Sequence, residues 1–349
     1  RVNPSFERFL RLPAGEQADV FTVAAQRIGT IPSYVEKDFW VCLVLEALYH
    51  GLPAGHPKLL FKGGTSLSKA FGLIRRFSED IDIVVFRDDL GFSGERDPAN
   101  RDANLSRKKR ETLFDELRAA CSAYIQGDLR GALDAALHTI GARGTIVTDE
   151  DDKDGQTLLV EYPSVFDASG PSYVSPRVRI EGGARSALDP HAARTVSPFI
   201  ADDLPDWPFD IAGITTIGPD RTFWEKLLIL HGAHCGYRDE QRLPSDRDRL
   251  SRHYYDVAMI GDTEVGRKAL GDHALATAVR EHNLLAFRQA WKKFEEAVPG
   301  SLRIVPQAEL RREIERDYAA MQGMVLGDAP PFDWIIERLA AIEAEVNPD

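Results

Sequence analysis

The sequence has few cysteines, no long apolar run and fewer basic than acidic residues. Its three cysteines lie far apart at positions 42, 121 and 235. They show no pairing pattern, so we expect reduced, buried thiols. There is no run of 18 apolar residues and no signal-peptide pattern, which argues against a membrane-spanning or secreted protein. We therefore expect a cytoplasmic protein with no membrane partner.

The excess of acidic over basic residues limits the possible binding partners. Lysine and arginine number 43 and acidic residues 55, for a net charge of −12. Such a charge repels nucleic acid at long range, so a polynucleotide partner requires a local basic patch. It does not oppose an enzyme that holds a divalent metal and a nucleotide. A chain of 349 residues can form one large domain or two ordinary ones.

Hydrophobic periodicity predicts an α+β protein with a helical C-terminal half. A strand, glycine turn, helix, strand unit is expected between residues 57 and 86. Further strands are expected at 144–148, 157–162 and 177–180, as a meander of the same sheet. We place the boundary near 215, which predicts a domain of residues 1–215 with N-terminal helices and a helical domain of residues 216–349. The predicted helices are 18–28, 32–49, 65–73, 106–126, 129–139, 221–234, 254–262, 268–283, 308–324 and 332–346.

The first chemical motif is the glycine turn. The turn is formed by Lys62, Gly63, Gly64, Thr65 and Ser66, after a strand and at the start of a helix. Glycines allow a tight bend and close approach to a ligand, and amides at a helix start attract phosphate oxygens. The bend could hold a triphosphate, although it lacks the spacing of a P-loop. An ordinary strand-to-helix turn is an equal alternative.

The second motif is a pair of carboxylates on the next strand. Residues two apart in a strand face the same side, so Asp80 and Asp82 project together while Ile81 and Ile83 pack on the opposite face. Two neighbouring carboxylates repel each other unless a cation shares them, and Mg²⁺ takes carboxylate and phosphate oxygens together. The alternative is a solvated acidic pair at a strand end. For an isolated pair this is the stronger reading.

Together the two motifs resemble the nucleotidyltransferase superfamily, whose signature is a G-[GS] turn followed at this spacing by D-x-[DE]. More narrowly, the chain resembles the AbiEii/AbiGii nucleotidyltransferase toxins, including the MenT type. The resemblance spans about residues 20 to 346. It is carried by the segments Glu36–Trp40, Phe61–Lys69, Arg76–Asp82, Arg221–Leu227, Arg252–Asp256 and Asp317–Met321.

The resemblance implies a polymerase-β-like catalytic core that uses Mg²⁺ (or Mn²⁺) and a nucleoside triphosphate. It also implies transfer of a nucleoside monophosphate to an acceptor, the tRNA 3′ end, by a toxin with a cognate antitoxin. The family's third metal-binding carboxylate would be Glu181, at the end of a predicted strand. Glu161 is the rival for this role, and a salt bridge of Glu181 with Arg179 or Arg185 is the structural alternative.

Two further residues come from the helical half. Lys226 lies at the border of an apolar stripe on the helix 221–231, so it points toward the body of the protein. The resemblance implies that Lys226 contacts the nucleotide phosphates and that Asp256 orients it. An exposed lysine, and an aspartate that caps a helix or pairs with Arg252, are the alternatives.

The remaining candidates surround these motifs. Ser78 precedes Asp80 by two residues and could bind a phosphate or simply begin the strand. We expect a modified Ser78 hydroxyl to block the site. Arg76 is assigned with Ser78 to nucleotide binding, and Arg75, Arg76 and the basic run 107–110 are also candidates for RNA-backbone contact. A basic run is usually a solvated helix face.

Three residues of one predicted helix could suggest a zinc site. His231, His234 and Cys235 have no second ligand cluster, so we interpret them as residues of an ordinary helix end rather than a zinc site.

The predicted enzyme could instead be a degenerate binding protein that acts through its helical half. That reading expects the loss of Asp80, Asp82 or Lys226, and all three are present.

Overall fold

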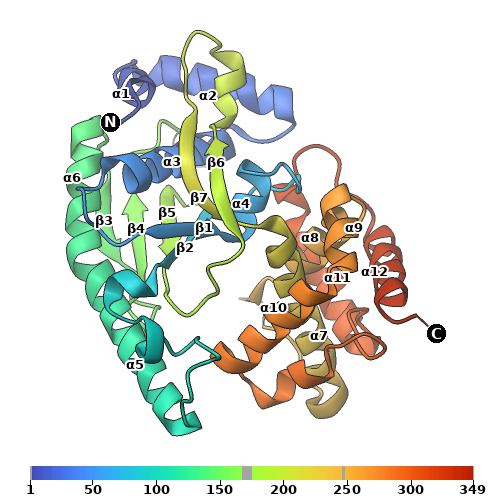
Figure 1. Ribbon diagram of the computed structural model, residues 1–349. Helices are drawn as coiled ribbons and strands as arrows, with labels where there is room; N and C mark the ends of the chain where they lie inside the picture. Colours follow the sequence, from blue (N-terminus) through green and yellow to red (C-terminus); the bar gives the residue numbers. More distant parts are fainter. Residues whose placement is uncertain (1, 167–174, 246–247, 349) are drawn as a thin grey trace. The chain divides into compact units, whose positions relative to one another are not determined.

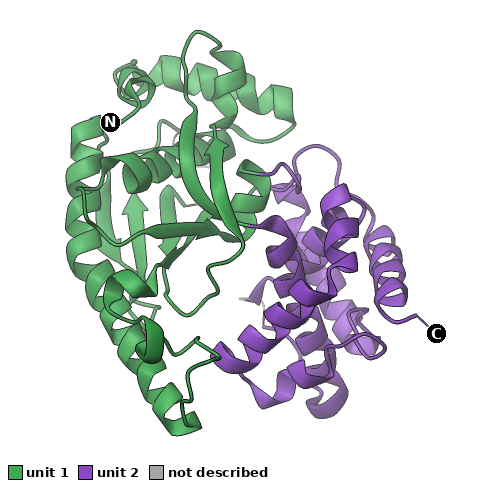
Figure 2. Ribbon diagram, in the orientation of Figure 1, with its two compact units in different colours: residues 1–70, 77–217 green, residues 71–76, 218–349 purple. Residues whose placement is uncertain are grey.

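The computed structural model describes residues 2–166, 175–245 and 248–348. The chain forms two compact units (Figure 2). Unit 1 contains residues 1–70 and 77–217, and unit 2 contains residues 71–76 and 218–349. The sequence suggested a boundary near 215, but nothing in it indicated that residues 71–76 belong with the C-terminal unit.

Unit 1 is built on a mixed sheet (Figure 1). Among the described residues the sheet has seven strands in the order β3-β4-β5-β2-β1-β7-β6. The β2/β5 and β1/β7 pairs are parallel, and the other neighbours are antiparallel. This confirms the predicted α+β class. The strands are β1 (Leu59–Lys62), β2 (Asp80–Val85), β3 (Thr145–Thr148), β4 (Thr157–Glu161), β5 (Arg177–Glu181), β6 (His191–Val196) and β7 (Ile211–Ile217).

Helix α3 (Pro32–Glu46) covers one face of this sheet. It contacts β2, β5 and β7, and Trp40 stacks on Tyr162, just beyond β4, with ring centroids 4.8 Å apart. The same face carries Ile81 and Ile83, which are 0% and 2% exposed. Because side chains alternate along a strand, Asp80 and Asp82 lie on the opposite face from α3.

The other helices of unit 1 begin and end at residues suited to those positions. Helix α5 is capped by Ser106, whose Oγ accepts a hydrogen bond from the Lys109 amide at 3.2 Å. Helices α2 and α6 end at Gly29 and Gly141, which adopt positive φ. These helices are α1 (Pro4–Leu10), α2 (Ala14–Ile28), α4 (Gly63–Lys69), α5 (Arg107–Tyr124) and α6 (Arg130–Ile140).

Unit 2 is helical, as predicted for the C-terminal half. The single helix expected over 268–283 is wrong: the chain forms two helices, because Asp272 caps the second through the Leu275 amide at 2.9 Å. Helix α7 crosses the middle of the unit and contacts α8, α9 and α10. The helices are α7 (Pro219–Glu240), α8 (Ser251–Gly261), α9 (Glu264–Gly271), α10 (His273–Ala286), α11 (Ala308–Met321) and α12 (Phe332–Val346).

One predicted helix end needs correction, and two strands were not predicted. The helix after the glycine turn ends at Lys69 instead of Leu73. Strands β6 and β7 were not predicted, because five of the six β6 residues are exposed and β7 contains Gly213 at φ 76°. Neither strand shows a regular apolar alternation. Within the described residues, no helix combines the length and apolar character needed to cross a membrane.

Candidate active site

Three neighbouring strands place charged side chains in one row. Lys62 of β1 is the register partner of Asp82 on β2, and Asp82 is the partner of Glu181 on β5. Register partners point to the same face of a sheet. Asp80 and its partner Arg179 form the adjacent row on this face. We call Lys62, Asp80, Asp82, Arg179 and Glu181 the carboxylate face; all are incompletely buried.

Gly63 lies directly against Asp82. A Cβ added at Gly63 would stand 1.9 Å from Asp82 Oδ2 and 2.6 Å from its Cγ. Gly63 also has φ 78°, which side-chain-bearing residues rarely adopt. The bend and the second carboxylate are therefore packed together, and only glycine fits between them. This is the close approach that a shared cation and phosphate site requires.

The hydroxyl groups of the bend have partners inside unit 1. Thr65 and Ser66 are 0% exposed. The Thr65 hydroxyl is 3.0 Å from Ser78 Oγ and also bonds the carbonyl oxygen of Asp80, and Ser66 Oγ donates to the carbonyl of Gly63 at 2.8 Å. The Thr65 hydroxyl thus joins the bend to the beginning of β2, and the Ser66 hydroxyl closes a bond within the bend. The Thr65 hydroxyl also brings Ser78 beside the bend, as its predicted site role requires.

Glu181, rather than Glu161, lies next to Asp82. Glu161 is the register partner of Arg177 on the far side of β5 from β2. Glu181 Oε1 is 3.0 Å from Arg179 Nε, which is the structural alternative considered for this residue. Within the described part of the chain, no three or more His, Cys, Asp or Glu side chains are grouped as a ready metal site. Asp80 and Asp82 fit a cation that takes its other ligands from substrate phosphates, as Mg²⁺ commonly does.

Unit 2 contains a second group of candidates around a buried carboxylate. Asp256 on α8 is 0% exposed. Its Oδ2 is 2.9 Å from Lys226 Nζ of α7, and its two oxygens accept from Arg76 Nε at 2.7 Å and Arg76 Nη2 at 2.8 Å. Lys226 Nζ is also 3.2 Å from His253 Nδ1. We call Arg76, Lys226, His253 and Asp256 the Asp256 cluster.

The Asp256 cluster carries excess positive charge. Burial alone would raise the pKa of Asp256, but Arg76 and Lys226 lower it below its ordinary range, so Asp256 is ionised. Burial lowers the pKa of Lys226; Asp256 offsets this only in part, and Arg76 and Arg252 lower it further. Burial, with Lys226 and Arg252 nearby, places the pKa of His253 well below its ordinary value. One carboxylate thus holds two cations beside a neutral imidazole.

The arginines assigned to ligands differ in their surroundings. Arg76 is 4% exposed and makes a two-bond contact with Asp256, whereas Arg75 is exposed. In the basic run, residues 107–109 are exposed and Arg110 donates to the carbonyl of Asn100 at 2.9 Å. Arg75 and residues 107–109 are therefore the accessible part of the predicted RNA contact.

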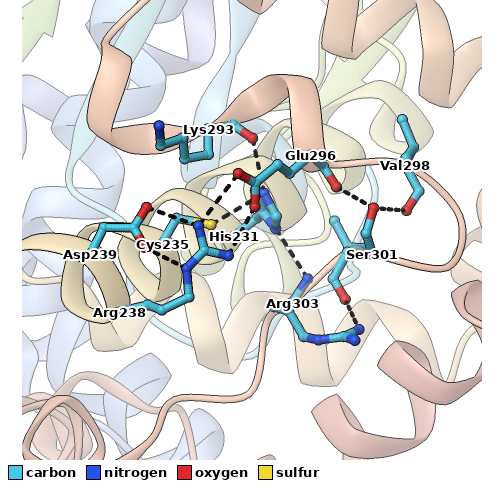
Figure 3. Close-up of polar contacts among 10 residues, drawn as sticks. His231, Cys235, Arg238, Asp239, Lys293, Glu296, Val298, Ser301 and Arg303 are labelled. Carbon is cyan, nitrogen blue, oxygen red and sulfur yellow. Dashed lines mark hydrogen bonds and ion pairs between the residues drawn. The ribbon is translucent and has the colours of Figure 1, made fainter.

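His231 and Cys235 of α7 have structural partners (Figure 3), and His234 Nδ1 lies 3.2 Å from the carbonyl of Val305. His231 Nδ1 accepts from the Arg303 amide at 3.1 Å, and its Nε2 lies 3.2 Å from the carbonyl of Lys293. Cys235 Sγ is 3.5 Å from the same Nε2, and burial raises the pKa of Cys235 to about 11. His231 therefore links the main chain at Lys293 and Arg303 to α7. All three cysteines of the chain are free and buried.

One residue of the Asp256 cluster was missed by the sequence analysis. His253 lies three residues before Asp256, a spacing that places both on the same side of α8. The R-H-Y-Y-D motif contains that spacing, so it could have suggested the placement. Its contact with Lys226 follows from the same spacing, because Asp256 was already expected beside Lys226.

Comparisons with known proteins address the family. A sequence model of the family described as nucleotidyl transferase AbiEii toxin, type IV TA system, matches residues 46–338. No curated protein matches the chain by sequence. Among solved structures, the nucleotidyltransferase toxin MenT4 of Mycobacterium tuberculosis H37Rv is similar at 15% identity and a TM-score of 0.36. The similarity covers 86% of this chain and 98% of MenT4. Because the family match extends over most of the sequence, the chain belongs to the AbiEii nucleotidyltransferase toxin family.

Proposed function

We propose that this protein transfers a nucleoside monophosphate from a nucleoside triphosphate to the 3′ end of tRNA, with Mg²⁺ (or Mn²⁺) as cofactor. Its family makes it a nucleotidyltransferase toxin, with a nucleoside triphosphate as donor and an antitoxin as partner. The metal, the acceptor and the residue roles are our proposal. The observation that carries it is the contact of Gly63 with Asp82, in one row with Lys62 and Glu181.

The carboxylate face would bind the donor. Asp80 and Asp82 would hold the divalent metal, and Glu181 would join them after release from Arg179. When bound, the metal supplies positive charge to the phosphate oxygens. Gly63 and Gly64 allow the triphosphate to approach the main chain. Thr65 keeps the bend fixed to β2, and Ser66 stabilises the bend through its bond to the Gly63 carbonyl. Lys62, on the same face, would bind a phosphate oxygen.

The Asp256 cluster would bind the leaving group. An acceptor hydroxyl attacks the α-phosphorus, the bond to the bridging oxygen breaks, and pyrophosphate leaves. Lys226 would offset the negative charge that develops on pyrophosphate. Asp256 would orient Lys226, and Arg76 would keep Asp256 ionised from its other side. Arg76 would therefore act on the nucleotide through Asp256, and Ser78 would contact a phosphate from the beginning of β2.

A label-transfer assay tests this function. The protein is incubated with each labelled nucleoside triphosphate, Mg²⁺ and total tRNA, and labelled RNA is separated on a gel. We expect label at the tRNA 3′ end with the parent and none with Asp80→Ala. Label transfer that persists in Asp80→Ala contradicts the catalytic assignment. Transfer to protein instead of RNA contradicts the acceptor.

A further inference from the structure

Helix α3 buries three consecutive charged residues that no motif of the site explains. Glu36, Lys37 and Asp38 are 2%, 3% and 3% exposed. Charged side chains are almost never fully buried unless they are paired. Successive residues of a helix point about 100° apart, so the three face different neighbours. Each must therefore have a separate partner.

Lys37 fixes the segment that leads into β2. Its Nζ is 2.6 Å from Glu79 Oε2, and Glu79 immediately precedes Asp80. One turn earlier on the same side of α3, Tyr34 stacks on Phe77 with ring centroids 4.6 Å apart and planes inclined by 8°. The ion pair and the stacked rings hold residues 77–79 from the face opposite Asp80 and Asp82.

Asp38 fixes the helix that follows the glycine bend. Its Oδ1 is 2.7 Å from Lys69 Nζ, and its Oδ2 accepts from the Phe199 amide at 2.7 Å. The Lys69 ammonium also lies 3.9 Å from the centre of the Phe199 ring. Lys69 is the last residue of α4, which begins at Gly63. Asp38 thus holds the far end of the element that forms the bend.

Glu36 points to neither element. Its Oε2 accepts from Ser164 Oγ at 2.6 Å and its Oε1 from the Val165 amide at 2.7 Å. These residues follow β4, two strands from β2. Glu36 therefore provides a buried charge of the same helix that does not contact the bend or the entry to β2.

The Lys37–Glu79 and Asp38–Lys69 ion pairs are buried, and burial reduces what an ion pair contributes to the free energy of unfolding. Buried pairs often contribute no more than a well-packed apolar pair of the same size, and their value can lie in fixing one geometry. Burial lowers the pKa of Lys37, and Glu79 and then Asp80 act against this. Lys69 is different, because Asp38 raises its pKa despite burial.

We propose that Lys37 with Glu79 positions the metal-binding carboxylates, and that Asp38 with Lys69 positions the phosphate-binding bend. Two adjacent residues of α3 thus set two separate parts of the site from behind the sheet. All four are positioning residues, since they act through Asp80 and Gly63 on the bound groups. The inference rests on the proposed function for the identity of those groups, a divalent metal and a triphosphate.

Two charge-neutral double variants separate the two roles. Lys37→Met with Glu79→Met removes one positive and one negative group from the first pair. Lys69→Met with Asp38→Asn does the same for the second, and the amide oxygen that Asp38→Asn introduces can still accept from the Phe199 amide. Because the net charge is unchanged in both, long-range attraction of metal or phosphate is unchanged. Glu36→Gln is the matched control on the same helix, and thermal melting verifies folding.

The readouts are direct binding measurements. Mn²⁺ binding to the protein alone is measured by electron paramagnetic resonance, and binding of a non-hydrolysable triphosphate analogue by calorimetry. For the Lys37/Glu79 variant we expect Mn²⁺ affinity to fall about tenfold, the size seen when groups behind metal ligands are removed. For the Asp38/Lys69 variant we expect analogue affinity to fall about tenfold and Mn²⁺ affinity to stay within about twofold. Glu36→Gln changes neither.

A folded Lys37/Glu79 variant that binds Mn²⁺ like the parent contradicts the role of this pair in positioning the carboxylates. If both variants lose affinity for Mn²⁺ and for the analogue equally, the two pairs do not have separate roles. If a double variant does not fold, Glu79→Asp and Lys69→Arg replace it, because both retain the charge; the first shortens the side chain and the second exchanges the ammonium for a guanidinium. The proposed function fails separately, when the folded parent binds Mn²⁺ and the analogue but labels no RNA.

Discussion

The two units hold charged side chains in opposite ways. Unit 1 presents Asp80 and Asp82 on one face of its sheet, where both are incompletely buried. Gly63 packs directly against Asp82. Unit 2 encloses Asp256 completely and surrounds it with Arg76 and Lys226. Carboxylates that remain accessible can take a cation from solvent, whereas a carboxylate enclosed by two cations can only orient them.

This difference favours complementary roles for the two units in the proposed function. The carboxylate face suits a metal, and the excess positive charge of the Asp256 cluster suits phosphate. Arg76 and Phe77 are consecutive in the chain but belong to different units. Each is held within its own unit, Arg76 by Asp256 and Phe77 by Tyr34.

Removing a carboxylate from unit 1 should have the largest effect. For Asp82→Asn we expect nucleotide transfer to fall on the order of a thousandfold, because the group that balances cation charge at the phosphates is lost. Glu161→Gln, which removes a carboxylate two strands away, is the control and should retain parental activity. Both rates are measured with saturating labelled triphosphate. Equal rates for Asp82→Asn and the parent would contradict the proposed role of Asp82.

Adding one methyl group at the bend should be almost as damaging. In Gly63→Ala the new Cβ displaces Asp82, and we expect transfer to fall roughly a hundredfold. Gly55→Ala is a matched control, since Gly55 has φ 85° and no atom within 4 Å of its Cβ position. Both variants should lose about 1–2 kcal/mol of unfolding free energy from the positive φ. Denaturant unfolding measures that loss, and only Gly63→Ala should lose activity.

Two substitutions in the Asp256 cluster should shift the pH dependence of activity in opposite directions. Lys226 must be protonated to attract phosphate, so activity is lost as pH rises through its pKa. Asp256→Asn removes the carboxylate that raises this pKa, and the alkaline limb of kcat/KM should move to lower pH. Arg76→Gln removes a cation that lowers it, and the limb should move to higher pH. We also expect Asp256→Asn to reduce kcat/KM by about tenfold at pH 7, since Lys226 loses its orientation.

The pH profile identifies the titrating group. Asp256, Arg76, Arg252 and His253 are the charged or titratable groups around Lys226. If both variants shift the limb in the same direction, Lys226 is not the group that titrates.

His231 should matter for stability and not for activity, although it lies on the same helix as Lys226. Burial lowers the pKa of His231, so the folded protein keeps it neutral. The unfolded chain binds the proton first, and stability therefore falls as pH drops below about 6.5. His231→Leu should cost about 1–3 kcal/mol at neutral pH, weaken this acid sensitivity and leave transfer unchanged. A large loss of activity would extend the site along α7.

The local parts of the site could be predicted from the sequence. Alternation places Asp80 and Asp82 on one side of a strand, and the glycine pair marks a bend before a helix. These features depend on residues close in sequence, where spacing determines direction. The placement of Glu181 beside Asp82 depends on parallel pairing of β2 and β5, and the contacts of Glu36, Lys37 and Asp38 depend on partners up to 161 residues away.

Long-range pairing explains the other differences. Strand β6 is an exposed edge strand with almost no apolar residues facing inward, so its only signal is its pairing with β7. Residues 71–76 follow a helix of unit 1 but bond to unit 2, where the Leu326 amide donates to the Arg75 carbonyl at 2.8 Å. No local pattern predicts which surface such a segment joins.

In the proposed site, Asp80 and Asp82 share a divalent cation with a triphosphate seated on the Gly63 bend. A crystal structure with Mn²⁺ and a non-hydrolysable triphosphate analogue tests it directly, through the anomalous signal of manganese. For this arrangement we expect a manganese peak in contact with both carboxylates and with phosphate oxygens of the analogue. Manganese or analogue bound elsewhere, with Asp80 and Asp82 contacting neither, would contradict it.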